Sequence, residues 1–344
     1  MLRLSLILLS SVLIIGSSWA QTSNDNDKLR VALKQYPQAD LDKDGVLTMA
    51  EAKSYMATMT GGGKGKAITP DFANVSYGAH ERNVLDFWKA KSDKPTPVVI
   101  FIHGGGFVGG SKDGYAKESN LRPYLDAGVS CVAINYPFLK SMPVQDIMRD
   151  CARAVQFVRS KAPEWNLAKS AIAAVGGSAG AGTSLWLATR DDLADPNASD
   201  PVLRESSRVC CAVLYSTQAT YDVTRWESFL GPAKPEIAQS GTSAAEFYHF
   251  PNLDYVKTPA AAPVLKECDM LGWISKDDAP LFIDNAMDVP APTNRNEWLH
   301  CTQHARTIKK QCESVGPPCI VVQDEKADKP DMHAFIMKYL NLGS

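Results

Sequence analysis

Short apolar runs alternate with stretches of helical periodicity along most of this chain, from about residue 74 onward. The apolar runs are rich in β-branched residues and lack strict alternation, which is typical of strands buried on both faces of a parallel sheet. The predicted strands comprise residues 97–103, 129–136, 171–177, 209–216, 279–283 and 319–323. Between them lie helical segments such as 144–161 and 300–314. This alternation predicts an α/β fold, with helices covering a mostly parallel sheet on both faces.

One long connection interrupts the alternation of strands and helices. Residues 218–278 separate two predicted strands and are rich in aromatic side chains, namely Tyr221, Trp226, Phe229, Phe247, Tyr248, Phe250 and Tyr255. A connection of this length predicts a cap over the sheet. We expect more than half of these rings to pack the small core of the cap itself. The other rings favour an apolar acyl or aryl pocket.

The first 20 residues have the pattern of an export signal. Arg3 precedes an apolar run of about 12 residues (4–15), and residues 18–20 supply a small-x-small cleavage site. A membrane-spanning helix needs about 20 apolar residues, so we expect cleavage after Ala20 rather than an uncleaved anchor. No cysteine follows the apolar run until Cys131, so none could carry a lipid near the cleavage site. We therefore expect a periplasmic or secreted protein without a stable membrane anchor.

The composition is that of a soluble globular protein, with 45% hydrophobic and 22% charged residues among 344. A net charge of -2 and the lack of a long basic run argue against nucleic acid as a partner.

Eight cysteines are too few for a disulfide scaffold in a chain of this length. Cys131, Cys210 and Cys211 lie in apolar runs and are expected to be buried free thiols. Cys312 and Cys319 flank a helix-to-strand turn and are the first pair to test for a disulfide.

A calcium-binding loop is predicted at residues 40–51, D-L-D-K-D-G-V-L-T-M-A-E. Acidic side chains at loop positions 1, 3, 5 and 12 and a glycine at the sharp turn form the pattern of an EF-hand, in which oxygen ligands surround a hard cation. The predicted ligands are Asp40, Asp42, Asp44, Glu51 and the backbone carbonyl of Val46. Helix capping by Thr48 and Glu51 is the alternative interpretation of that pair, but it does not explain three alternating aspartates.

The predicted calcium loop belongs to a small helix-loop-helix module over residues 21–60. Upstream of the loop, one helix face is apolar at Leu29, Ala32, Leu33 and Tyr36. Since no second loop occurs in the chain, we expect structural Ca²⁺ or a module that docks another protein, rather than a calcium switch. A glycine-rich linker over residues 61–73 then leads into the α/β domain, residues 74–344.

Two motifs with chemical significance follow predicted strands, where α/β sheets place their active sites. The first is Gly-Gly-Ser-Ala-Gly at residues 176–180, between a strand and a helical segment. A serine in this strand-turn-helix context, the nucleophile elbow, is held with its hydroxyl exposed above the sheet. Ser178 is therefore the candidate nucleophile.

The second motif is His-Gly-Gly-Gly-Phe at residues 103–107, after an earlier strand. Three successive glycines allow backbone N–H groups to approach a substrate carbonyl and to stabilise the oxyanion that forms on attack. A phosphate-binding turn is the alternative, but no GxxxxGK[ST] or GxGxxG motif follows a strand here.

With these motifs the chain resembles the hormone-sensitive-lipase-like carboxylesterases, the HGGG-bearing branch of the α/β-hydrolase fold, over residues 75–342. The resemblance implies that the amides of Gly105, Gly106 and Ala179 form the oxyanion hole. It also implies that His103 holds the glycine loop and is not the catalytic base.

The remaining catalytic residues are expected after Ser178, the acid first and the histidine second. His333 follows the last predicted strand and opens a C-terminal helix, where the base is expected. Both Asp284 and Asp288 follow the strand at 279–283 and qualify as the acid. Enzymes of the family that the chain resembles place the acid a few residues past this strand, which favours Asp288 and leaves Asp284 as the alternative.

Three further histidines need another explanation. His300 and His304 are four residues apart in a helical segment, a spacing that can bind a metal ion. No HExxH motif or third ligand accompanies them, so a solvated or packed helix face is the favoured interpretation. His249 lies in the predicted cap.

Together these residues predict an exported serine carboxylesterase that needs no metal or organic cofactor for turnover. Ser178 would attack the ester carbonyl, His333 would carry its proton to the leaving alcohol, and Asp288 would fix the histidine tautomer. The partner would be a small-molecule or polymer ester. One alternative is hydrolysis of acetyl or feruloyl esters on polysaccharides, and another is a calcium-dependent binding protein on an inactive hydrolase fold. The presence of all three catalytic residue types argues against the inactive fold.

Overall fold

The computed structural model describes residues 22–24, 26, 29–30, 33, 39–40, 44–49, 51, 66–238, 241–325 and 330–342. The predicted export signal and Asp42 of the predicted calcium loop lie outside these residues. The chain divides into two compact units, one comprising Met1–Ala67 with Lys117–Ser119 and the other Ile68–Ala116 with Asn120–Ser344. Within the described ranges, no helix has both the length and the apolar character needed to cross a bilayer.

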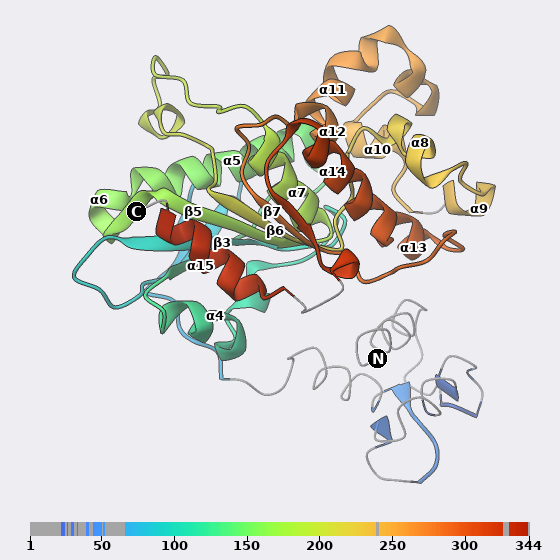
Figure 1. The fold of residues 1–344 in the computed structure, drawn as a ribbon, viewed down its shortest axis with the longest axis horizontal. Helices are drawn as coiled ribbons and strands as arrows, with labels where there is room; N and C mark the ends of the chain where they lie inside the picture. Colours follow the sequence, from blue (N-terminus) through green and yellow to red (C-terminus); the bar gives the residue numbers. More distant parts are fainter. Residues whose placement is uncertain are drawn as a thin grey trace. The chain divides into compact units, whose positions relative to one another are not determined.

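The larger unit contains a single eight-stranded sheet with the order β1-β2-β4-β3-β5-β6-β7-β8 (Figure 1). The strands are β1 (Phe72–Ser76), β2 (Val84–Trp88), β3 (Thr96–Ile102), β4 (Ser130–Ile134), β5 (Leu167–Gly177), β6 (Cys211–Tyr215), β7 (Leu281–Asp284) and β8 (Cys319–Val321). Strands β3 to β8 pair in parallel, whereas β1 and β2 pair antiparallel. The predicted mostly parallel sheet is confirmed, and each of the six predicted strands is present with shifted ends.

Strands β1 and β2 were not predicted from the hydrophobic pattern. Strand β1 is exposed along most of its length, so it lacks the apolar run that marks the other strands. In β2 the apolar sequence is interrupted by Asp86, which is buried and forms an ion pair of 2.7 Å with Lys112. Lys112 begins the short 3-10 helix η3 (Lys112–Tyr115).

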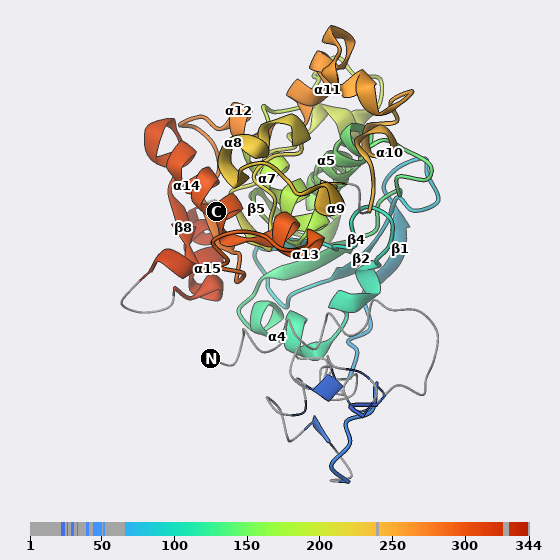
Figure 2. The ribbon, with the colours of Figure 1, turned by 90° about the vertical axis from the view of Figure 1, so that its right-hand side faces the viewer.

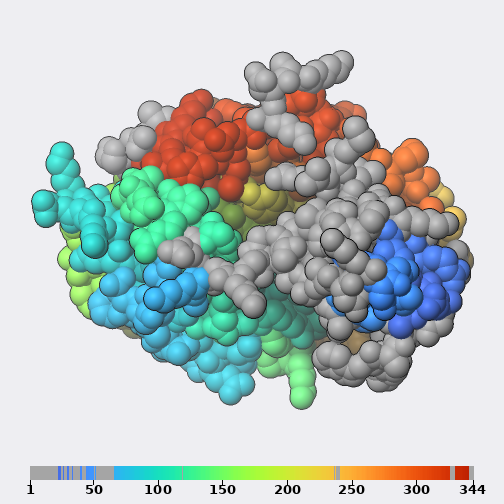
Figure 3. Space-filling model, turned by 90° about the horizontal axis from the view of Figure 1, so that it is seen from below, coloured from blue at the N-terminus to red at the C-terminus, as the bar shows by residue number. Residues whose placement is uncertain are grey.

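Alternate residues of β3 face two separate hydrophobic cores. Val98, Ile100 and Ile102 belong to one core, which also contains apolar residues of α5 (Val144–Ser160), α6 (Ala162–Trp165), α7 (Ala179–Thr189) and α14 (Thr302–Val315). Val99 and Phe101 belong to the other core, with residues of α4 (Glu118–Leu125) and α15 (Met332–Leu342). Figure 3 looks onto this second face, where α15 is red and α4 is green. Helices thus cover the sheet on both faces, as predicted.

The connection between β6 and β7 contains only short helices (Figures 1 and 2). They are η5 (Val223–Arg225), α8 (Glu227–Leu230), α9 (Pro235–Ala238), α10 (Ala244–Tyr248), η6 (Leu253–Lys257), η7 (Pro259–Ala261), α11 (Ala262–Glu267) and α12 (Met270–Trp273). Among the predicted cap rings, Tyr221, Trp226 and Tyr248 are buried. Phe229, Phe247 and Phe250 are partly buried and pack against the core.

The helical segment predicted at residues 300–314 is present as α14, except that His300 belongs to a separate preceding helix, α13. Helix α13 (Arg295–His300) ends at Cys301, whose backbone is extended, and α14 begins at Thr302. Asn285, directly after β7, donates from its side-chain amide to the Cys301 carbonyl at 3.2 Å, and Thr302 donates from its hydroxyl to the Asn285 carbonyl at 2.6 Å. Contacts from a distant strand therefore hold the break between the two helices. The remaining short helices are η4 (Pro201–Arg204) and η8 (Val322–Asp324).

Candidate active site

Ser178 occupies the sharp turn between β5 and α7. Its backbone has φ 51° and ψ -116°, a conformation that non-glycine residues rarely adopt. Such strain in a serine between a strand and a helix is the geometry expected for a nucleophile elbow. The Ser178 amide donates to the Tyr215 carbonyl at 2.8 Å, which ties the turn to the end of β6.

The glycine loop after β3 packs directly against this turn. A Cβ atom on Gly104 would lie 2.6 Å from the Gly177 carbonyl oxygen and 3.4 Å from the Cβ of Ser178, so only glycine allows this approach. Gly105 and Gly106 both have positive φ angles, 111° and 60°. The structure therefore brings together the two motifs singled out from the sequence.

His103 stabilises the glycine loop through contacts with Gly104 and Tyr136. It is buried, its ring stacks on Tyr136 with 4.1 Å between centroids, and its Nδ1 lies 2.7 Å from the Gly104 carbonyl. The Tyr136 hydroxyl donates to the His103 carbonyl at 2.6 Å. Burial lowers the pKa of His103 to about 4, so the ring is neutral at pH 7. The structure agrees with the structural role that the family resemblance implies.

The histidine beside Ser178 is His300, at the end of α13. Its Nε2 lies 2.9 Å from Ser178 Oγ. Its Nδ1 lies 2.9 Å from the side-chain oxygen of Asn296 and 3.0 Å from the backbone carbonyl of the same residue. Because both groups at Nδ1 are acceptors, Nδ1 carries the proton and Nε2 presents its lone pair to the serine hydroxyl. Burial lowers the pKa of His300 to about 4, although the Asn296 carbonyl acts in the opposite direction.

The prediction that places His333 beside Ser178 is wrong, because His300 occupies that position. His333 Nε2 lies 2.9 Å from the Pro123 carbonyl, and its ring lies beside Tyr124. The preceding residue, Met332, accepts a hydrogen bond from the Tyr215 hydroxyl at 3.0 Å. This contact fixes the start of α15 with the His333 side chain directed at α4.

The prediction that Asp288 orients the base is likewise corrected. Asp288 is exposed and pairs with Arg306 at 2.8 Å and 3.1 Å, and this guanidinium lowers the pKa of the carboxyl group. The alternative acid, Asp284, accepts a hydrogen bond from the Gln323 side chain at 2.7 Å. Among the described residues, no histidine contacts either carboxylate. Asn296 occupies the position that the sequence interpretation gave to an acid.

The sequence offered little signal for His300 and Asn296. An asparagine N-cap at Asn294, whose side chain accepts from the Glu297 amide, marks the start of α13 and is recognisable from sequence. The end of α13 is set by the long-range contacts of Asn285, which no local pattern encodes. The packed-face interpretation fits His304, which is buried and bonded to the Ala219 amide and the Trp298 carbonyl, but it fails for His300.

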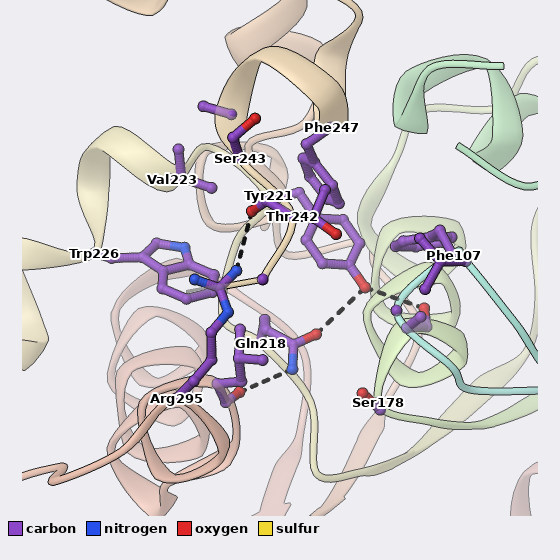
Figure 4. A pocket seen from close by; sticks show the side chains of 16 residues that line it. Phe107, Ser178, Gln218, Tyr221, Val223, Trp226, Thr242, Ser243, Phe247 and Arg295 are labelled. Atoms are coloured by element: carbon purple, nitrogen blue, oxygen red, sulfur yellow. Dashed lines mark hydrogen bonds between the residues drawn. The ribbon is translucent and has the colours of Figure 1, made fainter. Parts of the chain in front are cut away.

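A cavity of about 250 Å³ opens beside Ser178 (Figure 4). It is lined by Gly106, Phe107, Val108, Ser178, Ala179, Gln218, Tyr221, Val223, Trp226, Gly241, Thr242, Ser243, Ala244, Phe247, Arg295 and Leu299. The Tyr221 hydroxyl donates to the Ala179 carbonyl at 3.1 Å, and Gln218 donates to the Leu299 carbonyl at 2.8 Å. These bonds connect the cap to the elbow and to α13. The cavity can hold an ester against the Ser178 hydroxyl.

In the smaller unit, the described part of the predicted calcium loop is consistent with a cation site. Asp40 is buried, one of its oxygens accepts from the Gly45 amide at 2.8 Å, and the other has no hydrogen-bond partner among the described residues. Gly45 has φ 84°, as the sharp turn requires. Glu51 accepts from the Thr48 amide and hydroxyl, so the helix-capping interpretation also holds for this pair. No three metal-binding side chains come together within the described residues, which do not include Asp42.

Fold and site together define an α/β-hydrolase with a serine–histidine pair at the end of a central strand. A family model named BD-FAE matches residues 85–288, more than half of the chain, and the chain belongs to this family. It is 28% identical over 279 residues to the probable carboxylic ester hydrolase LipM of Mycobacterium tuberculosis, a match that covers 76% of this chain and 58% of LipM. It is also 30% identical over 168 residues to esterase LipC of the same organism, which covers 46% of this chain and 38% of LipC. The chain therefore spans well under two thirds of either curated relative.

Two solved structures with the same fold are named as a carbohydrate esterase and an acetyl ester-xyloside hydrolase. A truncated carbohydrate esterase from gut microbiota aligns with a TM-score of 0.59 and 19% identity, covering 80% of this chain and all of that one. An acetyl ester-xyloside bifunctional hydrolase from Caldicellulosiruptor lactoaceticus aligns with a TM-score of 0.52 and 15% identity, covering 80% of this chain and 96% of that one. At these identities the likeness concerns the fold. The names of the curated relatives agree with the predicted class of enzyme, a carboxylic ester hydrolase.

Proposed function

We propose that this protein is a serine carboxylesterase in which Ser178 is the nucleophile and His300 is the general base. The observation that carries the proposal is the 2.9 Å contact between Ser178 Oγ and His300 Nε2, at the mouth of a cavity lined by the glycine loop. A serine hydroxyl is a weak nucleophile until an adjacent base accepts its proton. The neutral His300 ring, protonated on Nδ1, is in the form that such a base requires.

In the proposed reaction, Ser178 Oγ bonds to the ester carbonyl carbon as its proton passes to His300 Nε2. The amides of Gly105, Gly106 and Ala179 would stabilise the oxyanion. Ala179 is the first residue of α7, where the backbone N–H groups have no acceptor within the helix. His300 then returns the proton to the leaving alcohol, and water releases the acid from Ser178 by the reverse sequence.

Asn296 would take the orienting role in this proposal. A neutral amide oxygen can fix the imidazole tautomer, as it does in cysteine proteases with a Cys-His-Asn arrangement. It stabilises the imidazolium less than a carboxylate would, because it carries no charge. Asn296 is therefore a positioning residue, and its effect on rate should be smaller than that of His300.

We also propose that the loop at residues 40–51 binds calcium and that the chain is exported. Asp40, Asp42, Asp44 and Glu51 would hold a structural Ca²⁺ together with the Val46 carbonyl. The unpartnered buried oxygen of Asp40 supports a cation there. The module could also dock a protein partner, and the amino-terminal signal would direct the chain to the periplasm or outside the cell.

As a more specific substrate class we propose esters carried by polysaccharides, such as acetyl groups on xylan. They are suggested by the names of two proteins of the same fold, a carbohydrate esterase and an acetyl ester-xyloside hydrolase.

Hydrolysis of short p-nitrophenyl esters by the purified protein tests the proposal. We expect turnover that a serine-directed phosphonate abolishes with one label on Ser178, as identified by mass spectrometry. Ser178→Ala should reduce the rate by several orders of magnitude while the fold persists, since comparable knockouts cost on the order of 10⁶ in kcat. Turnover that the phosphonate does not block would contradict the serine mechanism. A well-folded protein that hydrolyses no ester would favour the binding-protein alternative.

A further inference from the structure

A cationic side chain, Arg295, lines the same cavity as Ser178. Figure 4 shows it among the lining residues, with Gln218 between it and Ser178 in that view. The other lining residues are apolar, aromatic or neutral polar, and no acidic side chain is among those that the structure describes. The described lining of the cavity therefore carries one positive charge in a largely apolar wall.

Local structure holds Arg295 at this position. It is the first residue of α13, which is capped by Asn294. The guanidinium donates to the backbone carbonyls of Ile237 at 3.3 Å and Thr242 at 3.2 Å. Gly241 lies against it so closely that a Cβ atom there would be 2.9 Å from Arg295 Nε. The side chain is thus fixed against the segment that forms one wall of the cavity.

Arg295 has no ionic partner among the described residues. No described carboxylate oxygen lies within 4.0 Å of its nitrogen atoms. The side chain is half-buried, and this burial lowers the pKa of the guanidinium, which nevertheless stays charged at neutral pH. Two backbone carbonyls occupy two of the five N–H groups, so donors remain for a ligand.

A half-buried charge without a counter-ion favours an anionic ligand, because partial desolvation leaves its charge uncompensated. A guanidinium also matches the planar geometry of a carboxylate better than that of a neutral acceptor. From these observations we propose that the cavity selects esters that carry a carboxylate, which binds Arg295 while the ester carbonyl lies at Ser178. This inference rests on the proposed esterase function and names a substrate class for it.

A purely structural role for Arg295 predicts a different outcome. If the guanidinium only supports the segment of Ile237 and Thr242, its loss affects every substrate alike. If it binds the substrate, its loss affects anionic esters selectively. The ratio of two kcat/KM values separates the two roles, because a general loss of active protein cancels in the ratio.

The test compares mono-p-nitrophenyl glutarate with p-nitrophenyl valerate, which have equal acyl length and differ in the terminal carboxylate. The wild-type protein should favour the glutarate ester by about tenfold in kcat/KM, and added salt should reduce the preference. Arg295→Gln should lower the glutarate-to-valerate ratio about tenfold or more, and Arg295→Lys should lower it less. Arg204→Gln is the matched control, since Arg204 also donates to a backbone carbonyl, that of Ala198, and does not line the cavity.

Each outcome bears on one proposal. An unchanged ratio in Arg295→Gln, or a wild-type preference for the valerate ester, would overturn the assignment of Arg295 and leave the esterase function standing. Absence of hydrolysis of both esters by folded wild-type protein would overturn the esterase function itself. A ratio that falls in Arg295→Gln but not in Arg204→Gln supports carboxylate recognition.

Discussion

At the scale of single residues, the chemistry depends on which histidine faces Ser178. His300 lies against the serine hydroxyl, whereas His333 lies against a backbone carbonyl of α4. Both follow Ser178 in the sequence, so the order of catalytic residues does not distinguish them. Their three-dimensional contacts do.

Replacing each histidine in turn should separate them. We expect His300→Ala to reduce kcat on p-nitrophenyl acetate by at least about 10², because the general base is lost. His333→Ala should stay within a few-fold of wild type, since its ring contacts the Pro123 carbonyl and the Tyr124 ring rather than Ser178. Circular dichroism of both variants controls for folding. If His333→Ala is the inactive variant, the base must be assigned to His333 instead.

The pH dependence of kcat/KM should also identify the base. Burial holds the pKa of His300 at about 4, so the ring stays neutral and active well below pH 6.5. We therefore expect the acid limb of the profile to lie between about pH 4 and 5. An acid limb at pH 6.5 or above would indicate a histidine paired with a carboxylate, which keeps the imidazolium stable.

Acid stability has to be followed in the same pH experiment. A histidine with a folded-state pKa of about 4 takes up fewer protons between pH 6.5 and 4 than it does in the unfolded chain. The free energy of unfolding should therefore decrease as the pH falls through this range. His103 and His304 have pKa values lowered to about 4 by burial and act in the same direction. Circular dichroism at each pH distinguishes lost activity from lost structure.

At the scale of secondary-structure elements, buried apolar strands were predictable and exceptions to that pattern were not. Each of the six predicted strands pairs in the parallel part of the sheet, because continuous β-branched runs are required where both faces are covered. Strand β2 was missed because Asp86 interrupts its apolar sequence. The break at Cys301 was missed because it is stabilised by a hydrogen bond from Asn285, a residue directly after β7 and distant in the sequence. The same break places His300 at Ser178, so the unpredicted break and the unpredicted contact between His300 and Ser178 have one cause.

The buried pair between Asp86 and Lys112 gives a prediction about the stability of this edge of the sheet. Their side chains are 9% and 5% exposed, and Asp86 also accepts from the Asn74 amide at 2.8 Å. Asp86→Asn should reduce the free energy of unfolding by up to about 3 kcal/mol, because the buried Lys112 ammonium then keeps only its 3.3 Å contact with the exposed Asp113 as an ionic partner. Urea denaturation measures this loss, and adding Lys112→Met should recover part of it.

The exposed pair between Arg306 and Asp288 provides the matched control. With exposed fractions of 38% and 53%, it should contribute no more than about 1 kcal/mol, so Asp288→Asn, which leaves the second pair of Arg306 with Asp324 in place, should change the urea midpoint little. A loss in Asp288→Asn that equals or exceeds the loss in Asp86→Asn would contradict the importance of burial for the Asp86 pair.

At the scale of the whole molecule, the sequence predicted the fold class and the two motifs that meet at Ser178. Both motifs are local, since each is a glycine-rich turn after a strand, and parallel strands bring such turns to one edge of the sheet. His300 and Asn296, the base and the orienting residue of our proposal, follow the cap in the sequence and lie more than 100 residues beyond Ser178. Their positions depend on tertiary contacts that local periodicity does not encode. The family resemblance implied the order of serine, acid and histidine along the chain. It did not show which histidine the fold places beside Ser178.

The division of the chain into two compact units gives the last prediction. The proposed calcium ligands belong to the smaller unit and Ser178 to the larger, so metal removal should affect the two differently. Without a cation, the carboxylates of Asp40, Asp44 and Glu51 should repel one another, and one buried oxygen of Asp40 has no hydrogen-bond partner among the described residues. Chelation should therefore make the segment around residues 40–51 more susceptible to protease, while hydrolysis of p-nitrophenyl acetate persists. Asp40→Asn should reproduce the protease sensitivity without chelator. Loss of all activity on chelation, reversed by calcium, would instead make the ion a requirement of the catalytic unit.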